Sequence, residues 1–234
     1  MRVETSARVW RYGTANSVLI GGAAGVMAAV GIFILGIPLL LGGGDVTTAS
    51  ILGLSGLGVF AMAVFMAFGF VAMLRTRIRL AGVMLDATVP AGHNALLVPR
   101  FRTVHVDDVT TLRAVEKRDE IVRSFGFSVL CESLSIVTAA GDRIGLISDE
   151  YGYGMPFPLE AAGAGIAAAA GRDVADAGIV RAKASAELYG AASSNWTEPR
   201  LDAASAAKAR HSAVFTARII LVLTMLTIVL RAWA

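Results

Sequence analysis

The chain has 234 residues, of which 56% are hydrophobic and 17% charged, and its mean hydropathy is +0.66. This composition excludes an ordinary soluble domain and predicts membrane spans joined to one modest polar region. The formal net charge of +3 comes from basic residues near the ends of apolar segments, which favours contact with lipid headgroups over nucleic-acid binding. The single cysteine, Cys131, excludes an intramolecular disulfide framework.

Two apolar segments follow a short N-terminal segment, residues 1–16. Residues 18–41 and 50–74 carry no charge, and each is long enough for a helix that crosses a hydrocarbon core of about 30 Å. We therefore expect a transmembrane helical hairpin over 17–75. A cleaved signal peptide is the alternative, but its apolar region would be roughly 7–15 residues long and no second span would follow.

Basic residues flank this hairpin and predict its orientation. They are Arg2, Arg8 and Arg11 before it and Arg75, Arg77 and Arg79 after it. The positive-inside rule then places both ends in the cytosol of a bacterial plasma membrane. Small residues recur every four positions on the first span at Gly21, Gly25 and Ala29, which predicts close helix packing. The packed helix is either the second span or a helix of another subunit.

The segment 76–171 changes to short alternating runs separated by turn signals, which predicts a cytosolic all-β domain. The expected strands cover 77–80, 83–89, 95–98, 102–106, 111–117, 121–125, 128–138 and 143–148. The clearest hairpin joins 134–138 to 143–147 through a turn that contains Gly141. A helix is expected from about 159 to 170, with Pro158 in its first turn.

Two spans, the sequence FRTVHVDDVTTLRAV over 101–115, the 134–147 hairpin and the helix after Pro158 resemble bacterial membrane proteins that carry a PH-like domain. The resemblance covers residues 77–171. It implies a bent, nearly orthogonal β-barrel that a C-terminal helix closes at one end. It implies no catalytic signature.

The rest of the chain is expected to be mainly helical. Residues 172–198 are rich in alanine and mixed in charge, which indicates a helix, with a flexible linker as the alternative. Residues 199–234 predict one long helix that ends in a third transmembrane span over 213–233. Arg218 and Arg231 would reach opposite interfaces. Lys208, Arg210 and Arg218 keep the entry side of this span cytosolic, so the C-terminus is expected outside.

Few residues could ligate a metal ion or take part in catalysis. His105, Asp107 and Asp108 are possible metal ligands, but alternate side chains of a strand point apart, which favours solvated polar residues. Ser148 stands beside Asp149 and Glu150 without a histidine nearby in sequence, which favours turn chemistry over a nucleophile. We expect no catalytic site, no metal site and no cofactor.

Two surfaces of the polar region are candidates for binding. The first is a basic face toward anionic headgroups, formed by Arg75, Arg77, Arg79, Arg100 and Arg102. The second is an aromatic loop toward a protein partner, formed by Tyr151, Tyr153, Met155 and Phe157. The mixed charges over 113–123 indicate a solvated hairpin.

These features together predict a non-enzymatic, multi-pass membrane protein that serves as an accessory or assembly subunit of a larger membrane complex. Its partners would be membrane lipids and other integral membrane subunits. One alternative is a lipid-responsive regulator whose PH-like domain binds anionic headgroups. Another is an accessory subunit of a respiratory or other energy-transducing complex.

Overall fold

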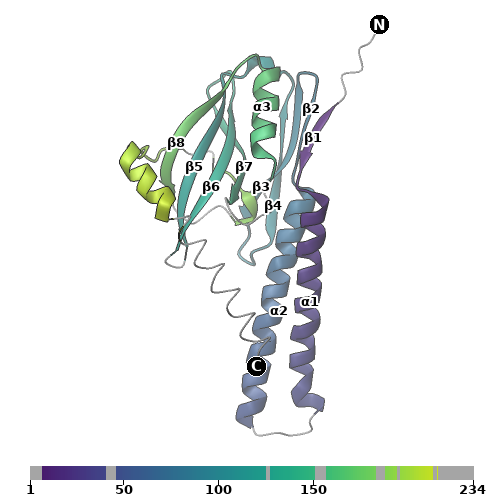
Figure 1. Ribbon diagram of the computed structural model, residues 1–234. Coiled ribbons are helices and arrows are strands. Elements are labelled where there is room, and N and C mark those ends of the chain that lie inside the picture. Colours follow the sequence, from purple (N-terminus) through teal and green to yellow (C-terminus); the bar gives the residue numbers. More distant parts are fainter. Residues whose placement is uncertain are drawn as a thin grey trace.

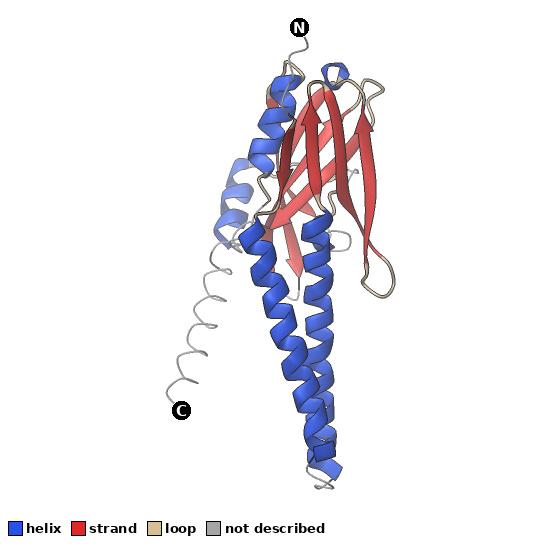
Figure 2. Cartoon of the chain, turned by 90° about the vertical axis from the view of Figure 1, so that its right-hand side faces the viewer, coloured by secondary structure: helices blue, strands red, loops and turns tan. Residues whose placement is uncertain are grey.

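The computed structural model describes residues 7–40, 46–124, 127–150, 157–182, 188–193, 196–212 and 215. Two long apolar helices, α1 (Thr14–Leu40) and α2 (Val46–Arg75), project together from one end of a β-rich domain (Figures 1 and 2). Among the described residues, these two helices are long and apolar enough to cross a membrane, which confirms the prediction of two long apolar helices. The predicted third span, 213–233, lies outside the described residues apart from Phe215.

The two helices pack closely because glycine lies where each meets the other. A Cβ atom on Gly31 would lie 2.9 Å from the backbone nitrogen of Phe60, and one on Gly56 would lie 2.8 Å from Cγ of Leu35. Neither position has room for a side chain. This packing follows the small-residue rule for helices in lipid.

A short strand before α1 pairs with the strand that follows α2. β1 (Arg8–Arg11) is antiparallel to β2 (Arg77–Ala81), with Arg11 opposite Arg77. Both ends of the helical hairpin therefore lie on the same side and belong to the same sheet. The sequence interpretation did not include β1, because four residues rich in arginine give no strand pattern.

The strands of the described residues form two sheets, and neither closes into a barrel, so the barrel geometry expected from the PH-like resemblance is not observed. One sheet has the order β1-β2-β3-β4, with β3 at Met84–His93 and β4 at Pro99–Val106. The other has the order β7-β6-β5-β8. Its strands are β5 (Ala114–Ser124), β6 (Phe127–Val137), β7 (Arg143–Glu150) and β8 (Val174–Ala182). β5 and β8 are parallel, and the other pairs are antiparallel.

Several local predictions are confirmed and others are wrong. The 134–147 hairpin is observed, with Val137 opposite Arg143. The expected strands at 111–117 and 121–125 are one strand, β5, and the expected strand at 95–98 is a turn. The helix expected over 172–198 is instead β8 followed by the short 3-10 helix η2 (Leu188–Gly190). Pairing with the edge of β5, which buries Ile179 and Val180, overrides the helical preference of the alanines.

Helix α3 (Leu159–Ala169) confirms the predicted helix after Pro158 and bridges the two sheets (Figure 1). A Cβ atom on Gly165 would lie 2.4 Å from Cζ2 of Trp10 in β1, while one on Gly163 would lie 3.0 Å from Cδ1 of Leu134 in β6. Both sheets and α3 contribute side chains to one apolar core. The 3-10 helix η1 (Val109–Thr111) leads from the first sheet to the second.

The contact between Gly165 and Trp10 yields a stability prediction. We expect Gly165→Leu to lower the free energy of unfolding by about 1–3 kcal/mol, because the new side chain must displace Trp10 and strain the edge of the first sheet. Denaturant unfolding of the full chain in detergent measures this loss. Ala168→Leu, at an exposed position of the same helix, is the control. Equal losses for the two variants would contradict the packing argument.

Candidate functional site

The small residues predicted on the first span divide between two surfaces of the hairpin. Gly21 belongs to the α1–α2 contact, since a Cβ atom there would lie 3.0 Å from the ring of Phe70. Ala24, on the same helix, is also buried. Gly25 and Ala29 are exposed, and nothing lies within 4 Å of a Cβ atom on Gly25. One of the three residues thus packs within the hairpin, and two face away from it.

Of the predicted aromatic contact loop, Phe157 is described, whereas Tyr151, Tyr153 and Met155 lie outside the described residues. Phe157 is buried and packs edge-on against Tyr12, with ring centroids 5.3 Å apart. Its backbone N–H donates a hydrogen bond to the carboxylate of Asp149. Burial, with a smaller contribution from the charge of Asp149, raises the pKa of the Tyr12 phenol above its ordinary value. Phe157 therefore belongs to the core and offers no surface for a partner.

The five arginines predicted to contact headgroups are in different environments. Arg77, Arg79 and Arg100 are exposed. The guanidinium of Arg75 lies 5.5 Å from the ring centroid of Phe101, where the end of α2 meets β4. These four lie near the junction of the helices with the first sheet.

Arg102 differs from the other four because its side chain crosses to the second sheet. Its guanidinium donates a hydrogen bond to the backbone carbonyl of Gly145, and its Nε is buried without a hydrogen-bond partner. Burial lowers the pKa of Arg102 below its ordinary value. Arg102 thus links the two sheets and does not point toward a headgroup.

Two carboxylates bracket His105 on the exposed face of the first sheet. The ring Nδ1 is 2.5 Å from Oδ1 of Asp86 on β3, and Nε2 is 2.8 Å from Oδ1 of Asp107. These hydrogen bonds raise the pKa of His105 above its ordinary value, and the bond to the carboxylate of Asp86 contributes most. When protonated, the imidazolium donates to both acids, which makes this an ion-pair cluster.

The metal set considered from the sequence does not assemble. Asp108 accepts hydrogen bonds from the backbone nitrogen and the hydroxyl of Thr110, at 2.9 and 2.6 Å, and so caps η1. These bonds lower the pKa of Asp108. No cluster of three or more metal-ligating side chains occurs within the described parts of the chain.

The serine considered as a nucleophile lies inside the domain. Ser148 is buried, and its oxygen accepts a hydrogen bond from the hydroxyl of Ser133 at 2.9 Å. Asp149 is the acceptor for the Phe157 N–H described above. The described side chains of Ser148 and Asp149 thus form no pair of nucleophile and base.

Sequence reasoning missed a further cluster of charged and aromatic side chains, the clasp, which surrounds the buried Arg118. We define the clasp as Arg118, Glu120, Arg143, Trp196 and Glu198. Arg118 is 2% exposed, and its Nε donates to Oε1 of Glu120, which is fully buried, at 2.8 Å. Its Nη1 is 3.1 Å from Oε2 of Glu198. The guanidinium groups of Arg118 and Arg143 each lie over the indole ring of Trp196, 4.5 and 4.9 Å from its centroid.

The clasp holds the segment after η2 against the outer face of the second sheet. A Cβ atom on Gly145 would lie 2.8 Å from the carbonyl oxygens of Ala192 and Ser193, so this strand position needs glycine for the segment to pass. The prediction of a solvated hairpin over 113–123 is therefore wrong at Arg118 and Glu120. A mixed-charge pattern does not show that another segment covers it.

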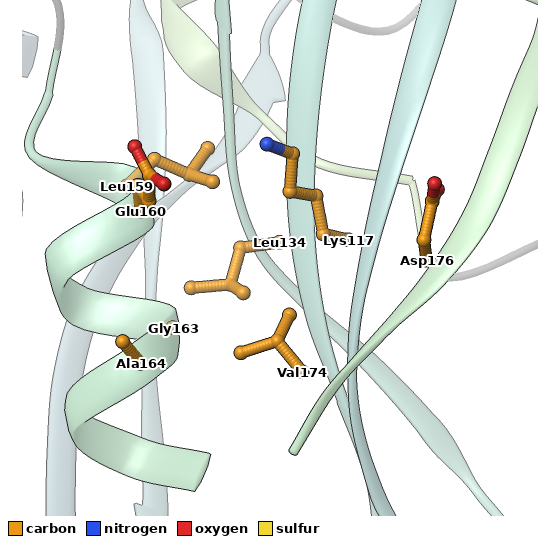
Figure 3. Close-up of a pocket in the computed structure, with 8 residues that line it drawn as sticks. All are labelled: Lys117, Leu134, Leu159, Glu160, Gly163, Ala164, Val174 and Asp176. Atoms are coloured by element: carbon orange, nitrogen blue, oxygen red, sulfur yellow. The ribbon is translucent and has the colours of Figure 1, made fainter.

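A small pocket lies on the opposite face of this sheet, beneath α3 (Figure 3). Its volume is about 270 Å³, below the roughly 300–1,000 Å³ of most ligand pockets. Leu134, Leu159 and Val174 form its apolar part, while Lys117, Glu160 and Asp176 carry charge. Lys117 is already paired with Glu132, which raises the pKa of its ammonium group. The pocket therefore offers little free chemistry for a ligand.

The described structure belongs to a mixed class in which a hairpin of two apolar helices is inserted between neighbouring strands of one sheet. Comparisons with protein-family models, with curated proteins and with solved structures find no match to this chain. Function must therefore be argued from the chain's own geometry.

The carboxylates around His105 lead to a pH prediction. We expect His105 to titrate above the ordinary value of about 6.5. Asp86→Asn should lower this pKa more than Asp107→Asn, because the bond to Asp86 contributes most. The ion pairs stabilise the fold fully below the unfolded-state pKa, and that contribution is lost as pH rises through the folded-state pKa. NMR titration measures the pKa of His105, and a value at or below 6.5 would contradict the geometry.

The clasp predicts non-additive mutational effects. We expect Arg118→Leu to lower the free energy of unfolding by about 3–5 kcal/mol, because it leaves the fully buried Glu120 without its partner. The double variant Arg118→Leu/Glu120→Leu should cost less than the single variant, since no buried charge remains. Denaturant unfolding of both variants in detergent tests this. A double variant less stable than Arg118→Leu would refute the explanation.

Proposed function

We propose that this chain is a non-enzymatic membrane protein, in which α1 and α2 span the bilayer and hold the two-sheet domain at the cytosolic face of a bacterial plasma membrane. It would act as an accessory or assembly subunit of a larger membrane complex. The observation that carries this proposal is the pairing of β1 with β2 across the base of the helical hairpin.

This pairing joins the anchor and the domain without a flexible linker. α2 ends at Arg75, and β2 begins at Arg77. The intervening Thr76 is fully buried, and its hydroxyl donates to the carbonyl of Ala72 at 2.7 Å. A helix that contacts a partner within the bilayer would therefore also fix the position of the domain above it. This rigid connection suits an assembly subunit.

The helices themselves support anchoring over transport. No Asp, Glu, Lys or Arg occurs from Thr14 to Leu40 or from Val46 to Leu74. Ionisable residues inside membrane segments usually mark substrate or proton paths. The hairpin therefore lacks the groups on which such a path depends.

A second small-residue surface on α1 supports a partner helix. Gly22, Gly25, Ala29 and Gly36 fall within about 60° of arc at 3.6 residues per turn, away from α2. Nothing lies within 4 Å of a Cβ atom on any of the three glycines. Glycine costs about 1 kcal/mol relative to alanine in a helix, and the α1–α2 contact does not explain these positions. Close approach of another helix in lipid does explain them.

The order of elements in the domain supports an interaction module. Strands β2 to β4 form one antiparallel group, β5 to β7 form a second, and α3 follows. The PH-like resemblance implies strands followed by one closing helix, and α3 follows β7 here, although β8 comes after it and neither sheet closes into a barrel. The lipid-reading alternative rests on the exposed arginines at the base of this domain.

The proposed partner contact leads to a test with a matched control. We expect Gly25→Leu to abolish co-migration with other membrane proteins after mild detergent extraction of the native protein, because the larger side chain blocks helix approach. Val30→Leu also enlarges an exposed position of α1 and should keep the partners. Mass spectrometry of native gel bands identifies what co-migrates. A wild-type chain that runs alone at monomer or homodimer mass would refute the accessory role.

A further inference from the structure

The β3–β4 hairpin extends well beyond the rest of its sheet, toward the helices. Arg77, the first residue of β2, pairs with Thr88 of β3. β3 continues for five more residues, to His93, which pairs with Pro99 of β4. At about 3.3 Å per residue, this extension is about 17 Å long. It runs beside the upper part of α2 (Figure 1), where Arg75 lies over the ring of Phe101.

A tyrosine braces the tip of this extension against α2. The hydroxyl of Tyr189 in η2 donates to the backbone carbonyl of Leu97 at 2.8 Å. The ring of the same tyrosine packs against Phe65 of α2, with centroids 5.6 Å apart. Phe65 precedes Arg75 by ten residues, or about 15 Å of helix. The hairpin tip therefore lies at the level of the charge-free part of α2.

The length of α2 places this level at the edge of a bilayer. Its 30 residues span about 45 Å, whereas a hydrocarbon core of about 30 Å needs about 20 residues. Twenty residues counted from Val46, at the end of α2 far from the domain, end at Phe65. The remaining ten residues, to Arg75, are those that the β3–β4 hairpin accompanies.

The tip itself presents two leucines outward. Leu96 is 78% exposed and Leu97 is 41% exposed. The turn is held by the side chain of Asn94, whose Oδ1 accepts from the backbone nitrogens of Leu96 and Val98, both at 2.9 Å. Leu97 has φ of 58°, a left-handed conformation that is costly for leucine. A fixed turn thus exposes apolar side chains next to the apolar surface of α2.

We propose that the β3–β4 tip, centred on Leu96 and Leu97, inserts into the interfacial layer of the leaflet on the domain side. The occupant of this surface is the lipid bilayer, because the tip continues the apolar surface of α2. Arg75, Arg77 and Arg100 lie between the tip and the body of the domain, at the depth where headgroup phosphates would meet them. Arg11, opposite Arg77, adds a fourth positive charge to these three arginines. The inference rests on the proposed membrane anchoring.

An environment-sensitive fluorophore at three single-cysteine positions tests the proposal. The full chain, with Cys131→Ser, carries nitrobenzoxadiazole at Leu96→Cys, Phe33→Cys or Val83→Cys and is reconstituted in phosphatidylcholine–phosphatidylglycerol vesicles. Phe33 is an exposed α1 residue, and Val83 lies in the exposed β2–β3 turn at the far end of the sheet. Quenching by nitroxide lipids is compared with quenching by aqueous iodide.

We expect lipid-nitroxide quenching at positions 96 and 33 to exceed that at position 83 several-fold, with iodide showing the reverse order. If position 96 is quenched like position 83 while position 33 is quenched by nitroxide lipids, the inference is overturned. The proposed membrane anchoring by α1 and α2 would not be affected by that result. Quenching of position 33 by iodide would instead overturn the membrane anchoring itself. A parallel series that keeps the buried Cys131, with the signal of the unsubstituted chain subtracted, guards against a folding defect of Cys131→Ser.

Discussion

The pairing of β1 with β2 is the constraint on which the rest of the structure depends. A four-residue strand and a five-residue strand meet only because α1 and α2 return the chain to its starting point. The helices in turn pack closely because glycines at positions such as 31 and 56 admit the opposing backbone and side chains. Helix packing and strand pairing are therefore coupled, and a change at the helix contact is transmitted to the edge of the first sheet.

The second sheet is stabilised in a different way, because both of its faces are covered. α3 packs on one face, and the segment held by the clasp covers the other. Covering the outer face takes Arg118 and Glu120 out of water, which is costly unless every partner is in place. One oxygen of Glu120 lacks a hydrogen-bond partner even so. The clasp thus contributes mainly by fixing one position for the segment after η2, and it contributes less to the stability of the fold.

Sequence reasoning succeeded where one local periodicity determines the secondary structure. It failed where contact with a segment distant in sequence determines pairing or burial. The two apolar helices, the 134–147 hairpin and α3 follow from run length, alternation and a proline signal. β1 and β8 are edge strands whose pairing partners lie far away in sequence, so no local pattern marks them. Burial of Arg118 depends on Trp196, some eighty residues later. Likewise, Gly25 and Gly21 look equivalent in sequence, and only the packed hairpin separates the inner position from the outer one.

The surplus length of α2 connects these features to the proposed membrane position. A helix of 30 residues exceeds the hydrocarbon core by about ten, and an unsupported apolar end would have to tilt or stand in water. Here the β3–β4 extension and Tyr189 pack beside the end of α2 near the domain, and the guanidinium of Arg75 lies over the ring of Phe101. In the proposed membrane position, the β3–β4 hairpin would share the interfacial layer with α2, which would fix the height of the two sheets above the bilayer.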